Sequence, residues 1–122
     1  KETIIKTFFE ILNSIKLYHW KTDSYSQHKA TDEIHEALSK QTDRFIEVLM
    51  GKTKKKVSLV NTQIKMYDLN DKLQLKHRLF EFRQFLLNID DVLQGRNDND
   101  LRNIRDEMVE SIHQFLYLLT LE

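Results

Sequence analysis

The sequence predicts an all-α protein, a single four-helix bundle over residues 1–122 with a long crossover between its second and third helices. Proline is absent and glycine occurs only twice, so the chain lacks the turn residues that a sandwich or barrel needs. Hydrophobic residues make up 40% of the chain and recur at helical spacing in four stretches. The three links between these stretches are short, long and short in that order.

The first two helices are expected over residues 3–19 and 28–50, joined by a short polar link. In the first, the apolar face ends in His19, and Glu10 lies on the opposite face. The second is predicted to stop at Gly51, because glycine favours the left-handed position after a helix. The expected core residues are Ile4, Ile5, Phe8, Ile11, Leu12 and Ile15 in the first helix and Ala30, Ile34, Ala37, Leu38, Phe45, Val48 and Leu49 in the second.

A long connector is expected over residues 52–66, which show no sustained helical period. Helices follow over about 68–94 and about 97–120, and the last begins in a run of good N-cap residues. A connector of about 15 residues reaches about 50 Å when extended, whereas a helix of about 20 residues is about 30 Å long. The connector can therefore run the height of the bundle, which is the ferritin-like arrangement. The expected core residues of the last helix are Leu101, Ile104, Met108, Ile112, Phe115 and Leu119.

The third helix carries two apolar stripes, about 140° apart on a helical wheel. One seam of a bundle does not easily bury both, so the explanation is either a wide core face or a second contact with another subunit. The stripes consist of Leu69, Leu73, Phe80 and Leu87, and of Leu75, Leu79, Phe82, Leu86 and Leu93.

Charge and composition exclude several classes of function. Basic and acidic residues number 19 each, so the net charge gives no general attraction to nucleic acid or anionic lipid. Cysteine is absent, which leaves only histidine and carboxylate for metal binding. No apolar run approaches the roughly 18 residues that span a bilayer, and no signal-peptide pattern opens the chain. We therefore expect a soluble, cytoplasmic protein without a membrane partner.

Ligand-type residues share one face of the second predicted helix. His28 and Asp32 are four residues apart, Asp43 and Glu47 are four apart, and Asp32 precedes Asp43 by nearly three whole turns. This face lies opposite the core, where carboxylates are usually just solvated. If they bind metal, the two pairs lie about 16 Å apart along the helix, too far for one centre. Two antiparallel copies related by a twofold axis would bring each pair opposite the other pair of its mate, which predicts a His/carboxylate site between subunits.

Residues 17–52 resemble the ferroxidase motif of Dps-type miniferritins, a branch of the ferritin-like superfamily. The stretch 18–30 also looks like that of small ferritin-like proteins of bacteriophages and large DNA viruses. The resemblance implies a homo-oligomer, at least a twofold dimer, with a di-iron site between subunits. The residues that carry it are His19-Trp20, His28-x-x-x-Asp32 and Asp43-x-x-x-Glu47 just before Gly51.

The resemblance implies iron, as Fe²⁺ and Fe³⁺, or another divalent metal, together with oxidation of Fe(II) and iron storage. In it, Asp43 and Glu47 are the main carboxylate ligands, with Glu47 as the bridge, and His28 and Asp32 come from the partner. Imidazole and carboxylate are ligand types that suit Fe(II). The helical wheel points His19 toward its own core, so its role as a ligand rests on the resemblance. We expect Trp20 to pack at the end of the helix.

Other interpretations are open. A structural or virion-associated bundle without catalytic activity would have virion or capsid proteins as partners and would be located in the virion. An intrachain metal site from Glu110-x-x-His113 with Glu10 and Glu81 is disfavoured, because Glu10 and Glu110 lie opposite the apolar faces of their helices. The lysine cluster at 52–56 would contact DNA phosphates in a cage that coats DNA, although such a cluster is more typical of a solvated loop.

Overall fold

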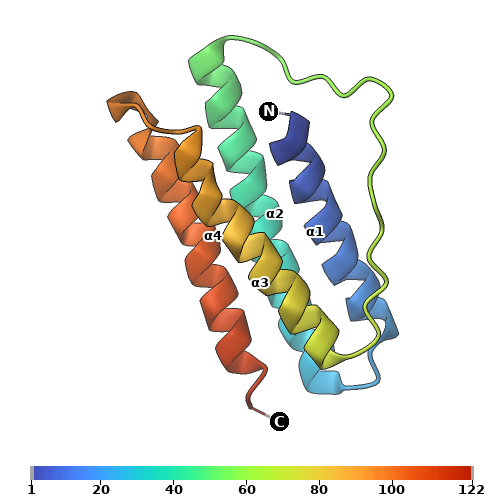
Figure 1. Cartoon of the computed structure of the whole chain (residues 1–122). Helices are drawn as coiled ribbons and strands as arrows, with labels where there is room; N and C mark the ends of the chain where they lie inside the picture. The colour runs from blue at the N-terminus through green and yellow to red at the C-terminus, as the bar shows by residue number, and fades with distance from the viewer. Residues whose placement is uncertain (1, 122) are drawn as a thin grey trace.

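The computed structural model describes residues 2–121, which form four α-helices, two 3₁₀ turns and no strand (Figure 1). The expected all-α class with four helices is confirmed. Within the described part of the chain, no helix is both long and apolar enough to cross a membrane. The elements are α1 (Glu2–Lys21), α2 (Tyr25–Thr53), α3 (Lys72–Asn88), η1 (Ile89–Asp91), η2 (Arg96–Asp98) and α4 (Asn99–Leu118).

The helices pack in the cyclic order α1, α2, α4, α3, so that each packs mainly on two neighbours. α1 and α4 run in one direction, and α2 and α3 run in the other (Figure 1). The crossover, residues 54–71, leaves the end of α2, runs along the outside of α1 and reaches the start of α3 at the opposite end of the bundle. The long connector predicted between the second and third helices is therefore present, and it contains no helix of its own.

Three phenylalanines from three helices meet in the core. The ring of Phe8 packs edge-on against Phe45 at 5.6 Å and against Phe82 at 6.3 Å between centroids. Such edge-to-face pairs stabilise a core beyond the area they bury. The core residues expected in the first, second and last helices are all buried, apart from four partly buried residues, Ile4, Leu12, Ala37 and Val48.

The ends of α2 differ from the prediction. Gly51 is helical, and the left-handed residue that ends α2 is Lys54, with a φ of 58° and an N–H that donates to the Met50 carbonyl. The prediction failed because an exposed glycine with no crowding around it is tolerated inside a helix that other contacts stabilise. The helix begins at Tyr25, before the expected residue 28, because the Ser24 side chain accepts a hydrogen bond from the Gln27 N–H.

α3 is shorter than predicted, and only one of its two apolar stripes is in the core. The helix begins after Asp71, whose side chain accepts the Gln74 N–H, and it gives way to η1 at residue 89. Leu69 belongs to the crossover and is buried there. A wide core face is therefore excluded as the explanation. The stripe that is buried in the core consists, within α3, of Leu75, Leu79, Phe82 and Leu86. The stripe that is exposed consists, within α3, of Leu73, Phe80 and Leu87.

Glu10 is buried, which corrects its expected place on the solvent face of the first helix. The crossover covers that face, and the Glu10 carboxylate accepts the backbone N–H of Lys65 at 2.8 Å. A helical wheel does not contain this information, because the covering segment is distant in the sequence. The crossover is also held by an ion pair between Lys21 and Asp68.

Candidate functional site

Four of the five predicted ligands lie on the outer face of α2. His28, Asp32, Asp43 and Glu47 are all exposed, as their position opposite the core predicts. His19 is buried at the C-terminal end of α1, also as the helical wheel predicts. The short turn between the two helices determines which of these residues meet.

His19 and His28 meet across this turn. Their rings stack with centroids 3.8 Å apart and planes inclined by 19°. Nδ1 of His19 donates to the carbonyl oxygen of His28 at 2.7 Å, and Nδ1 of His28 donates to the carbonyl oxygen of His19 at 2.8 Å. The Thr31 hydroxyl lies 3.1 Å from His19 Nδ1 and donates to the Gln27 carbonyl at 2.7 Å. These reciprocal bonds fix both rings against the turn.

The same bonds determine the tautomer of both imidazoles. A carbonyl oxygen only accepts hydrogen bonds, so each Nδ1 carries a proton and each Nε2 of the neutral ring keeps a free lone pair. His19 Nε2 has no hydrogen-bond partner among the described residues. The atom is not fully buried, so it keeps some contact with solvent. Histidines that ligate metals are typically held in this way, through the opposite N–H to a backbone carbonyl.

The carboxylates on this face are also free of partners. Asp32, Asp43 and Glu47 form no ion pair with any residue between 2 and 121, whereas nearby Glu36 pairs with Lys40 at 3.2 Å. The described chain nevertheless contains no group of three or more His, Asp or Glu side chains placed to hold one metal ion. A single chain thus presents a His/Asp pair and an Asp/Glu pair along α2, without a closed site.

His35 lies beside this group, although it was not among the predicted ligands. The structure places it half-buried, and its pKa is lowered mainly by that burial, with a further contribution from the positive charge of Lys16. Its electrostatic neighbours also include Asp32, which raises the pKa, and His19, which lowers it. Its position seven residues, or about two turns, after His28 was the signal that could have identified it.

Trp20 does not pack at the helix end as expected, and its side chain is 71% exposed. It follows His19 directly, so on a helix it points about 100° away from the buried ring. Tyr25, the first residue of α2, is also exposed. The α1–α2 turn therefore presents two large aromatic side chains to solvent.

An apolar groove of about 340 Å³ lies beside Asp43, between α1, α2 and the first part of the crossover. Its walls include Leu12 and Ile46, and it is also lined by Phe9, which is nearly half exposed. Asp43 therefore stands at the edge of an apolar surface.

The rival set of metal ligands is not brought together. Glu10 is occupied by the crossover backbone, Glu81 lies 3.7 Å from His77, and His113 lies 3.4 Å from Arg83. None of these contacts joins Glu110 to the other members of the proposed set.

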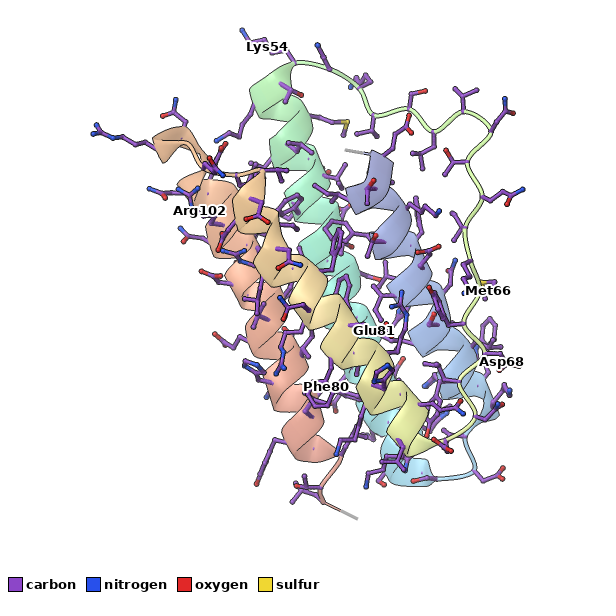
Figure 2. The ribbon with its side chains drawn as sticks, in the orientation of Figure 1. Lys54, Met66, Asp68, Phe80, Glu81 and Arg102 are labelled. Carbon is purple, nitrogen blue, oxygen red and sulfur yellow. The ribbon has the colours of Figure 1, made fainter. Side chains whose placement is uncertain are left out.

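The lysine cluster at 52–56 divides into two parts. Lys52 belongs to α2 and pairs with Asp100 at 2.8 Å and Asp98 at 3.6 Å. The other three, Lys54, Lys55 and Lys56, are exposed. Figure 2 shows Lys54 where the crossover leaves α2. These three lysines are the only part of the cluster that is available to a phosphate.

Fold and site together define an all-α four-helix protein with an exposed His/carboxylate face on its second helix and two histidines fixed at its first turn. Residues 19–119 match the model of the family DUF5856, described as a family of unknown function, and the chain belongs to this family. The match includes all five predicted ligands. No curated protein and no solved structure matches the chain.

Proposed function

We propose that this protein is a Dps-like, ferritin-like iron-binding protein, in which two copies related by a twofold axis form His/carboxylate sites between them. In each site, His28 and Asp32 of one copy, with His19, face Asp43 and Glu47 of the other. The observation that carries the proposal is the pair of reciprocal Nδ1 bonds, which hold both imidazoles with Nε2 available.

The arrangement of the helices supports the ferritin-like assignment. α2 and α3 run in the same direction, and a crossover as long as the bundle joins them (Figure 1). A bundle with a short second link would have antiparallel helices there.

The position of the ligands on α2 supports a site between subunits. The two pairs lie about 16 Å apart along one helix, so neither pair can complete the other within a chain. An antiparallel mate reverses the helix and places opposite pairs together twice. The groove beside Asp43, with Phe9 and Ile46, offers apolar surface for such a contact.

The donor set fits iron. Neutral imidazole and carboxylate are ligands that suit Fe(II), and iron bound there would supply electrons to O₂ or peroxide and be stored as Fe(III). Asp43 and Glu47 supply negative charge that favours a cation, and Glu47 has two carboxylate oxygens with which to bridge two ions. The turn that holds His19 and His28 keeps their protons on Nδ1 and their acceptor atoms available.

An anaerobic titration with Fe(II), with the native mass measured at saturation, tests the proposal. We expect saturation at about one or two irons per chain in an even-numbered oligomer, lost in Asp43→Asn and kept in Glu110→Gln, an exposed carboxylate variant outside the site. Equal loss in both variants, or no saturable binding by the folded wild-type protein, would overturn it.

A second candidate is a structural or virion-associated bundle without catalytic activity. The exposed Trp20 and Tyr25 at the α1–α2 turn favour it, because large exposed aromatic side chains are typical of contacts between proteins. The same titration separates the two functions, since a purely structural bundle gives no saturable binding of iron.

A further inference from the structure

Two arginines of this protein are more than nine-tenths buried, and they differ in how their guanidinium groups are satisfied. Arg105 in α4, 5% exposed, donates through Nε to Asp106, through Nη1 to the Leu86 carbonyl and through Nη2 to Asp90. Arg78 in α3, 9% exposed, makes no hydrogen bond to any residue described in the structure, and its Nε is fully buried without a partner. Its two Nη groups make no hydrogen bond within the described chain and are not fully buried, so they can donate to an acceptor from outside the chain.

Arg78 lines a shallow cavity of about 340 Å³ between α3 and the last part of the crossover. In Figure 2, Glu81 is labelled on α3, and Met66 and Asp68, the neighbours of the lining residue Tyr67, are labelled on the crossover. The guanidinium carbon of Arg78 lies 3.9 Å from the centre of the Tyr67 ring, so this ring covers one side of the group. The cavity is lined by Tyr67, Leu69, Leu73, Gln74, His77, Arg78 and Glu81.

The chemistry of the lining defines a ligand class. The planar guanidinium offers paired N–H donors that match the two oxygens of a carboxylate or phosphate. Gln74 and His77 add polar side chains at the cavity, and the Gln74 side-chain oxygen is already engaged by the Asn70 N–H at 2.9 Å. This leaves the Gln74 amide N–H₂ as the free end. Leu69 and exposed Leu73 form an apolar wall beside these donors.

We propose that this cavity binds a small amphiphilic anion, with its carboxylate or phosphate group on Arg78 and its apolar part against Leu69 and Leu73. The site is independent of the His/carboxylate face, because it is built from α3 and the crossover. Binding gives the Nη groups of Arg78 an acceptor within hydrogen-bond distance, which the described chain does not supply.

Glu81 is the competing anion within the chain. Its carboxylate lies 3.7 Å from Arg78 Nη1 and 3.7 Å from His77 Nε2, beyond hydrogen-bond distance in both cases. Its side chain is 53% exposed and free to turn outward. Removing its charge should therefore strengthen binding of the external anion.

Titrations monitored by NMR, with phenyl phosphate, benzoate, inorganic phosphate and neutral phenol as probes, test the proposal. We expect saturable binding of the two aromatic anions, mutual competition between them, weaker binding of inorganic phosphate and none of phenol. Whichever aromatic anion binds more tightly identifies phosphate or carboxylate as the preferred group. Binding of phenol as tight as that of phenyl phosphate, or no saturation by either aromatic anion at about 10 mM, would overturn the proposal.

Variants separate the roles of the side chains. Arg78→Lys keeps the charge but removes the paired donors, and we expect it to weaken binding of phenyl phosphate by about tenfold. Arg83→Lys is the matched control, because Arg83 is also in α3 and stacks on an aromatic ring, that of Phe80 at 4.8 Å, outside the cavity. Glu81→Gln should tighten binding severalfold, and it tests the site even if Arg78→Lys fails to fold. Equal affinities in all four proteins would exclude Arg78 as the anion-binding residue.

Discussion

At the residue scale, the turn between α1 and α2 fixes two imidazoles mainly through bonds to the backbone. Each ring donates to the carbonyl of the other histidine, so the geometry depends chiefly on the turn, and the Thr31 hydroxyl is the side-chain group that lies beside His19 Nδ1. The turn itself is stabilised by the Ser24 cap and by buried Thr31. A change in the link length would therefore alter both rings together.

His35 makes a prediction about pH at the same scale. Its folded-state pKa is lowered from 6.5, chiefly by burial, so the unfolded chain binds more protons as pH falls past that value. The contribution of neutral His35 to the free energy of unfolding is fully present above pH 6.5, and it is lost as the pH falls through the pKa of the folded state. We expect His35→Gln to lose less stability than the wild type between about pH 7.5 and pH 5 in urea unfolding. His113→Gln, at an exposed site on α4, is the control, and identical pH dependence in all three proteins would contradict the prediction.

At the element scale, α2 continues through Gly51, and this position gives a clear test of the helix end. A Cβ built on Gly51 meets nothing within 4 Å, and the residue is exposed within a helix. We expect Gly51→Ala to raise the free energy of unfolding by about 0.5–1 kcal/mol, because alanine loses less backbone entropy on folding. A left-handed Gly51 would instead make the same substitution destabilising. Urea unfolding distinguishes a helical Gly51 from a left-handed Gly51. Lys54→Gly, at the true left-handed position, is expected to be a second stabilising variant.

The crossover is the other element with a testable attachment. The buried Glu10 carboxylate accepts the Lys65 N–H, so Glu10→Ala leaves that backbone donor without its partner. We expect a loss of about 1–3 kcal/mol in the free energy of unfolding and faster tryptic cleavage at the lysines of the crossover. Glu10→Gln retains an acceptor oxygen and should lose less on both measures. Equal cleavage rates in the wild type and Glu10→Ala would show that this bond does not hold the crossover.

At the scale of the whole molecule, the predictable features are those that depend on local pattern. Apolar period and link length indicated four helices and the crossover, since both are properties of contiguous sequence. The burial of Glu10 and the stacking of His19 on His28 depend on which segments lie against each other in space. The Gly51 error has another origin, because residue propensity is weak compared with the packing that stabilises α2.

Exposed apolar side chains on different faces of the bundle provide a test of where copies of this molecule would associate. Phe9 lies in the groove beside Asp43 and is 46% exposed, and Phe80 lies on the outer stripe of α3 and is 39% exposed. The two residues are alike in type and exposure but lie on different faces of the bundle. They therefore form a matched pair for locating a contact between subunits.

We expect Phe9→Lys to convert an even-numbered oligomer into monomers and to abolish iron saturation, because a charge in the groove opposes the apposition of two α2 faces. Phe80→Lys should leave both properties unchanged. Each variant should retain the stability of the monomer within about 0.5 kcal/mol, as exposed substitutions usually do. Sedimentation equilibrium, the Fe(II) titration and urea unfolding measure these three properties. Dissociation by Phe80→Lys alone would move the contact to the outer stripe of α3 and would separate subunit association from the His/carboxylate face.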